Sequence, residues 1–138
     1  MKGNKPSVSK FQFEKYIIDK ASISLKDENV GMEMEFRIEP KAQVVNNEMN
    51  LTLDVEVNDK EKNLMLTLRI VGFFKYEGDS VDEINQFLYM NGPAILFPYV
   101  RSYVSNLTAL SGVSPIIMPT LNMQPIGEYL KSKMTTAK

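Results

Sequence analysis

The eight residues MEMEFRIE, at positions 32–39, decide how the first half of the chain is interpreted. Apolar side chains occupy every even position of this stretch, and charged side chains occupy every odd one. Because successive side chains of a strand point to opposite faces, the alternation predicts a β-strand with one buried face. We expect Pro40 to end the regular part of this strand, since proline cannot donate a ladder hydrogen bond.

Three further runs of residues alternate in the same way. Between Phe11 and Leu25 the odd positions, Ile17 among them, carry most of the apolar side chains. Residues 49–57 and 64–76 repeat the pattern on either side of a polar loop at 58–63. Short connections between consecutive strands favour an antiparallel meander. Such a sheet has one apolar face, which the second half of the chain must cover.

Helical spacing begins after the fourth predicted strand. Ser80 and Glu83 match a capping box, which predicts a helix start at this point. The segment 91–93, Asn-Gly-Pro, should interrupt this first helix, and Pro93 would then open a second, longer helix. Gly112 is a natural C-terminal stop for the longer helix.

The last part of the chain is predicted to be extended and then helical. Prolines at positions 115, 119 and 125 forbid a regular helix and favour extended backbone. A short helix is expected over residues 126–134. The sequence therefore predicts an α+β fold, in which a four-stranded antiparallel β-meander is followed by a long helix, an extended crossover loop and a short C-terminal helix. We expect residues 1–138 to form a single domain.

Composition excludes several classes of functional site. The 138 residues include no histidine and no cysteine, which removes imidazole and thiolate metal sites and Ser-His or Cys-His catalysis. No glycine-rich phosphate loop is present. The net charge of -1 gives no drive toward nucleic acid or an anionic membrane. With no signal peptide and no membrane-spanning run, we expect a soluble cytoplasmic protein without a cofactor.

Paired carboxylates are the remaining candidates for catalysis. Glu33/Glu35 and Asp54/Glu56 alternate with apolar residues, which places them on the solvated face of the sheet. Asp82/Glu83 fall in a helix first turn, where the helix dipole accounts for them. We therefore expect no catalytic residue and no enzymatic activity.

A long charge-poor segment separates the two halves of the chain. Between Glu83 and Glu128 the only charged side chain is Arg101. One four-stranded sheet can cover only part of so apolar a segment, so the remainder should pack against another subunit or a ligand. Met118 and Met123 add flexible side chains of the kind that accept varied apolar partners.

Residues 95–101, ILFPYVR, resemble the ILFPYAR signature of the SecB family of protein-export chaperones. The likeness extends upstream to Asn91 and Pro93. It continues through Gly112, Pro115, residues 121–123 and the pair Tyr129-Leu130, and the strands at 11–13 and 72–74 are similar to the family's first and fourth strands. It therefore covers nearly the whole chain, although the loop is about two residues shorter here than in the family.

The resemblance implies a homotetramer, a dimer of dimers, that holds unfolded polypeptides such as preproteins without ATP. Carried over to this chain, the client-binding residues are Phe97, Tyr99, Pro115, Leu121 and Met123. Composition adds Ile116, Ile117 and Met118 from the shortened loop. Phe74, in the strand that resembles the family's fourth, is also a candidate. Packing in the core or at a subunit interface is the alternative for these side chains, and aromatic residues at such spacings usually pack.

The chain also departs from the family pattern. Acidic residues on the first and fourth strands of export members help to engage the SecA motor; the matching positions here are Ser22 or Ala21, Lys26 or Leu25, and Thr67. The family's zinc-binding tail is expected to be missing, since the sequence ends at Lys138. These departures weaken the expectation of docking on a SecA-type motor. They leave open a chaperone dedicated to one client, such as an antitoxin, a non-chaperone adaptor module or a small-ligand carrier.

Overall fold

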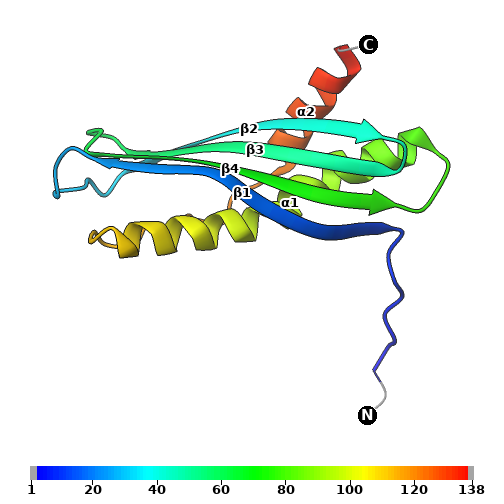
Figure 1. Ribbon diagram of the computed structural model, residues 1–138, viewed down its shortest axis with the longest axis horizontal. Coiled ribbons are helices and arrows are strands. Elements are labelled where there is room, and N and C mark those ends of the chain that lie inside the picture. Colours follow the sequence, from blue (N-terminus) through cyan, green and yellow to red (C-terminus); the bar gives the residue numbers. More distant parts are fainter. Residues whose placement is uncertain (1–2, 137–138) are drawn as a thin grey trace.

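The computed structural model describes residues 3–136, with side chains described as far as residue 133. It has four strands: β1 (Phe11–Leu25), β2 (Met34–Val45), β3 (Glu48–Asp59) and β4 (Leu64–Tyr76). The helices α1 (Val81–Leu110) and α2 (Gln124–Thr136) follow (Figure 1). The buried core combines one face of the sheet with side chains of both helices. The α+β class, with its four antiparallel strands, long helix, extended loop and short final helix, is confirmed.

The strand order differs from the simple meander expected. Strands β2, β3 and β4 are consecutive antiparallel neighbours, but β1 pairs with β4, so the order is β1-β4-β3-β2. The connection at residues 26–33 therefore has to cross the end of the sheet to reach β2. Alternation along each strand determines its buried face, whereas neighbour choice depends on this longer-range crossing.

Strand β1 contains two irregularities that shift its alternation. Its pairing with β4 shifts register between Phe13 and Lys15, and again between Ile18 and Lys20. Tyr16 and Ile18 consequently lie opposite the buried β4 positions Gly72 and Ile70. Ile17, expected on the buried face, is 45% exposed on the other side. An extra residue in one strand reverses the facing of those that follow, and the second irregularity restores it.

Pro40 does not end β2, contrary to expectation. It is buried and pairs with Leu53, and the strand continues to Val45. The Pro40 carbonyl accepts a 3.2 Å hydrogen bond from Lys133 of α2, so this peptide points away from β3 at the open edge. Proline is tolerated on an edge strand because its missing N–H would have faced outward.

The helix α1 is continuous through Pro93 and Pro98, so the interruption predicted at 91–93 is wrong. Two glycines allow α1 to approach the sheet closely. A Cβ on Gly92 would lie 2.8 Å from the Leu51 side chain of β3, and one on Gly72 of β4 would lie 2.7 Å from Leu96. Packing against the sheet outweighs the local cost of proline. Among residues 3–136, no helix is long and apolar enough to cross a membrane.

Pro93 also creates the docking point for α2. Because Pro93 has no N–H, the carbonyl of Tyr89, four residues earlier, lacks its helical partner. Gly127 of α2 lies against this carbonyl so closely that a Cβ there would collide with the Tyr89 oxygen. The absence of a side chain at Gly127 therefore lets α2 cover the gap that Pro93 leaves in α1.

A buried carboxylate holds the end of the sheet together. Asp59 is fully buried, and it accepts hydrogen bonds from the backbone N–H of Gly31 at 2.8 Å and of Leu64 at 3.0 Å. Burial alone would raise the pKa of Asp59, but hydrogen bonds from the amides of Leu64, Gly31 and Asn63 outweigh it and lower the pKa. Asp59 thus joins the 26–33 connection to the turn before β4.

Replacing Asp59 by Asn should lower the free energy of unfolding by about 1–3 kcal/mol, since the amide cannot accept from both N–H groups. The depressed pKa of Asp59 adds stability above its unfolded-state pKa of about 3.9, and this is lost as pH falls through the folded-state pKa. Urea unfolding of the original and the Asp59→Asn protein from pH 7 to pH 3 measures the two free energies of unfolding. The difference between them should become smaller toward pH 3. The exposed Asp54→Asn control should change stability by less than about 0.5 kcal/mol. Equal effects of the two substitutions would contradict the role of Asp59.

Replacing Gly127 by Ala should destabilise the protein, although helix propensity alone predicts a gain of up to about 1 kcal/mol. The collision with Tyr89 should reverse the sign and cost about 1–3 kcal/mol. Thermal or urea unfolding measures the change, with Gly3→Ala as a control because nothing lies within 4 Å of Gly3. A stabilised Gly127→Ala protein would show that α2 does not dock on this carbonyl.

Candidate functional site

The crossover loop, residues 111–123, joins α1 to α2 without regular secondary structure. Ile116 and Met118 point into the core and are buried, whereas Ile117 between them is 69% exposed. Pro115 and Pro119 are both exposed, and prolines hold the backbone extended. The loop therefore alternates like a strand, although it belongs to no sheet.

Two hydroxyl groups of α1 hold the loop at one residue, Ile116. The Ile116 N–H donates to Thr108 Oγ1 at 2.9 Å, and Ser105 Oγ donates to the Ile116 carbonyl at 2.8 Å. Thr108 is fully buried, and its hydroxyl donates in turn to the Val104 carbonyl at 2.8 Å. Ile116 is thereby fixed at both polar atoms.

Beyond Ile116, the loop backbone has no such partners. Within the described part of the chain, the peptide groups from Ile117 to Leu121 make no backbone hydrogen bond. Leu121 and Met123 are half-buried and pack against the core. This stretch presents exposed apolar atoms next to unpaired N–H and C=O groups, the combination that an extended polypeptide can bind.

Tyr99 belongs to an aromatic cluster on the side of α1 that faces β1. Its ring lies 4.4 Å from that of Tyr16 and 5.7 Å from that of Phe13, and it is 37% exposed. Phe74, which lies 5.3 Å from Phe13, is fully buried. Tyr16 and Tyr99 therefore form the accessible edge of a cluster whose interior is core.

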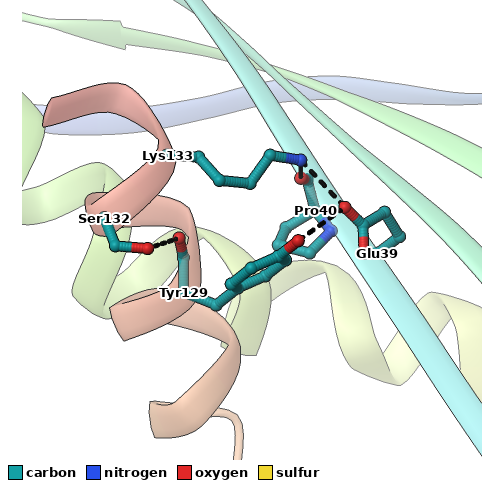
Figure 2. A network of polar contacts seen from close by, with 5 residues as sticks. All are labelled: Glu39, Pro40, Tyr129, Ser132 and Lys133. Atoms are coloured by element: carbon teal, nitrogen blue, oxygen red, sulfur yellow. Dashed lines mark hydrogen bonds and ion pairs between the residues drawn. The ribbon is translucent and has the colours of Figure 1, made fainter. Parts of the chain in front are cut away.

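The helix α2 closes the other side of the site by packing against β2 (Figure 2). Lys133 Nζ donates to Glu39 Oε1 at 2.8 Å, and the Tyr129 hydroxyl donates to the same oxygen at 3.2 Å. The hydrogen bond from Lys133 lowers the pKa of Glu39, and Glu39 in turn raises the pKa of Lys133. Since Lys133 also bonds to Pro40, this network fastens α2 to the edge strand (Figure 2).

The nine predicted client-binding residues fall into two groups. Those buried in their own protomer are Phe74, Phe97, Ile116 and Met118. Those with accessible surface are Tyr99, Pro115, Ile117, Leu121 and Met123. The loop brings the last four together, but no described contact joins them to Tyr99. Client contact remains a prediction for all nine.

Sequence reasoning missed three residues that shape this surface. Thr108 and Ser105 position the loop, and their signal was the presence of hydroxyl side chains on an otherwise apolar helix shortly before Gly112. Tyr16 was missed because the irregularity in β1 reverses its facing. Leu110 is 87% exposed at the end of α1.

The carboxylate pairs do not assemble a site with paired acid–base chemistry. Glu33 and Glu35 each form an exposed ion pair, with Lys60 and Lys62 respectively. Asp54 and Glu56 are exposed on the outer face of the sheet. Among the residues that the structure describes, no three His, Cys, Asp or Glu side chains gather as metal ligands.

Comparison with known sequences gives one family. The profile of the family described as preprotein translocase subunit SecB matches residues 10–133. An uncharacterized protein of Methanocaldococcus jannaschii is 29% identical over 130 residues, which cover 86% of this chain and 83% of that protein. Protein-export protein SecB 1 of Polaromonas naphthalenivorans is 26% identical over 117 residues, with coverage of 83% and 76%.

Solved structures share the fold. A SecB-like chaperone of Mycobacterium tuberculosis, in complex with a ChAD peptide from the HigA1 antitoxin, superposes with a TM-score of 0.70 at 14% identity. The match covers 81% of this chain and 90% of that one. A protein of unknown function from Streptococcus agalactiae gives a TM-score of 0.52 at 10% identity, with coverage of 83% and 100%. With the family profile matching from the start of β1 into α2, the chain belongs to the SecB family.

Proposed function

We propose that this SecB-family chaperone is an ATP-independent holdase that binds extended segments of unfolded polypeptides, preproteins among them. The observation that carries the proposal is the crossover loop, with Ile117 exposed beside a run of unpaired peptide groups from 117 to 121. An extended client could bury its side chains against the apolar atoms and satisfy these peptide groups. Several such contacts along one chain would hold it unfolded by mass action.

The position of the loop would favour such binding. Because Thr108 and Ser105 already fix Ile116, the first part of the loop loses little further freedom when a client binds. Because a preordered loop loses less conformational entropy on binding, more of the contact energy contributes to affinity. The buried members Ile116 and Met118 would then act by supporting the loop, while Ile117, Leu121 and Met123 would contact the client.

The proposed assembly is a homotetramer built as a dimer of dimers. The helix α1 leaves Val81, Met90 and Leu110 more than half exposed, which is apolar surface that a second copy could cover. Light scattering should then give the mass of four 15.7 kDa chains. A mass of two chains would reduce the assembly to a dimer.

A chaperone dedicated to one client is the second candidate function. It is favoured by the fold shared with the Mycobacterium tuberculosis SecB-like chaperone, whose structure holds an antitoxin peptide. Ser22 and Thr67 also share a 2.8 Å hydroxyl hydrogen bond at positions where export members carry acidic residues, which supports a role independent of a SecA-type motor. Mass spectrometry of co-purified polypeptides separates the candidates: one dominant protein favours the dedicated role, and a broad set favours general holding.

No catalysis and no cofactor are part of the proposal, since the SecB family is not known for enzymatic activity. The proposed compartment is the cytoplasm, where a chaperone for preproteins would meet its clients before export. The whole chain is proposed to act as one chaperone domain.

Substituting Ile117 by Asp should weaken holding without unfolding the protein, because this side chain is mostly exposed. Losing one apolar contact, about 1.5–3 kcal/mol, should lower client affinity about tenfold or more. Light scattering of several aggregating clients, at one tetramer per client, measures the effect. Val45→Asp is the matched control, since Val45 is similarly exposed but lies on the outer face of the sheet.

Two results would count against this account. If the unmodified protein suppresses the aggregation of none of the clients, the holdase proposal is wrong. If the Val45 and Ile117 variants lose activity equally, the crossover loop is not the client-binding surface.

A further inference from the structure

The outer face of the sheet, opposite the helices, has a shallow depression that the proposed chaperone site does not use. Its volume is about 360 Å³, and it is lined by Lys41, Ala42 and Gln43 of β2, Asn50 and Thr52 of β3, and Val71 of β4. Amide and hydroxyl side chains thus surround an apolar floor. Half-exposed Phe73 and Ile17 extend this floor toward β1.

Strand pairing arranges these side chains in two adjacent rows across the sheet. One row runs Lys15, Phe73, Asn50, Gln43, and the next runs Ile17, Val71, Thr52, Lys41. Each row therefore has a lysine at one end, on opposite edges of the sheet, with uncharged side chains between.

The two lysines are not neutralised by the protein itself. Neither Lys15 nor Lys41 forms an ion pair with any described carboxylate. Lys15 Nζ instead lies 5.0 Å from the centre of the Phe73 ring. The flanking rows differ, because Arg69 there pairs with Asp19, and Lys75 pairs with Glu14. The two rows that contain Lys15 and Lys41 thus carry only positive and uncharged side chains, whereas the rows on either side carry charges of both signs.

We propose that these two rows bind an extended acidic segment of a partner protein. The segment would carry two carboxylates, one at each end of a run of apolar side chains. The carboxylates would pair with Lys15 and Lys41, and the apolar side chains would cover Ile17, Val71 and Phe73. An exposed apolar patch with a charged rim is typical of a protein interaction site. This surface lies on the face of the sheet opposite the loop, so the inference does not depend on the holdase proposal.

The sheet geometry sets the spacing of the two acidic residues. Strands lie about 4.8 Å apart, so three spacings from β1 to β2, with an offset of one row, separate the two lysine Cα atoms by about 16 Å. An extended peptide covers that distance in about five residues, but only side chains an even number of positions apart share a face. Six positions span about 20 Å, and the flexible lysine side chains cover the difference. The edge strand adds polar atoms: Ala42, two residues from Pro40, presents its backbone at the same open edge.

Fluorescence anisotropy with a neutral dye tests this on the whole protein. The probe is a seven-residue peptide, capped at both ends, with Asp first, Glu last and alternating Leu and Val between, so that both acidic side chains lie on the same face. We expect saturable binding that weakens as ionic strength rises from about 0.05 M to about 0.5 M. The peptide with Asn and Gln at its ends should bind at least about tenfold more weakly, since it lacks both ion pairs.

Charge reversal identifies the surface. Lys15→Glu and Lys41→Glu should each weaken peptide binding about tenfold, whereas Lys15→Arg and Lys41→Arg should retain it. Lys26→Glu is the matched control, because Lys26 is exposed, forms no ion pair with the described residues and lies outside the two rows. Suppression of client aggregation should be unchanged in all these variants, which separates this site from the loop.

Four outcomes would overturn the inference. The first is that the acidic peptide does not bind at concentrations up to about 1 mM, so that its binding free energy is weaker than about 4 kcal/mol. The second is equal binding of the neutral peptide. The third is an equal loss of binding in the Lys26→Glu control. Displacement of the peptide by glutarate at similar concentration would also contradict it, since a free dicarboxylate lacks the apolar side chains.

Discussion

The contact between Gly127 and the Tyr89 carbonyl determines the course of the second half of the chain. Pro93 leaves this carbonyl without a helical partner, and only a residue without a side chain can lie against it. From Tyr89 to Leu110, α1 runs on for about 30 Å. The crossover loop must therefore return along α1 before α2 can begin, which places the loop beside the helix instead of in solvent. The hydrogen bonds that Lys133 donates to Glu39 and to the Pro40 carbonyl fix the far end of α2 on β2.

Because the loop returns along α1, its first part is hydrogen-bonded to the helix, while its peptide groups from Ile117 to Leu121 make no backbone hydrogen bond within the described residues. The hydroxyls of Thr108 and Ser105 hydrogen-bond to both backbone polar atoms of Ile116, so α1 satisfies the backbone of this residue. The following peptides face no such groups, and prolines keep them extended. Exposed apolar and polar atoms in this arrangement suit a ligand that is itself extended and unpaired, as an unfolded polypeptide is. A folded partner has already satisfied its backbone and gains less from such a surface.

Much of the fold could be predicted from sequence because its main signals are local. The alternation of residues 64–76 predicted a strand whose buried face is confirmed, and that of residues 34–39 predicted the inward face of β2. Met32, expected on the same face, is 99% exposed because β2 begins only at Met34. Tyr16 and Ile17 could not be assigned correctly, since composition does not reveal an irregularity in β1. The break expected at Pro93 is wrong because a local rule omits the contacts of Gly92 with Leu51 and of Gly127 with Tyr89. In the loop, composition indicated an apolar site but could not distinguish buried Ile116 from exposed Ile117. That difference depends on Thr108 of α1, whose hydroxyl accepts a hydrogen bond from the Ile116 N–H.

Hydrogen–deuterium exchange of the loop amides, with and without an unfolded client, tests whether polypeptides bind at the crossover loop. In the free protein, the amides of Ile117, Thr120 and Leu121 should exchange fast, while that of Ile116 is protected by Thr108. Binding of a client should slow exchange at the first three and leave Ile116 unchanged. If the client binds and these three amides still exchange at their free rates, polypeptides are held elsewhere on the molecule and the loop is not the client-binding surface.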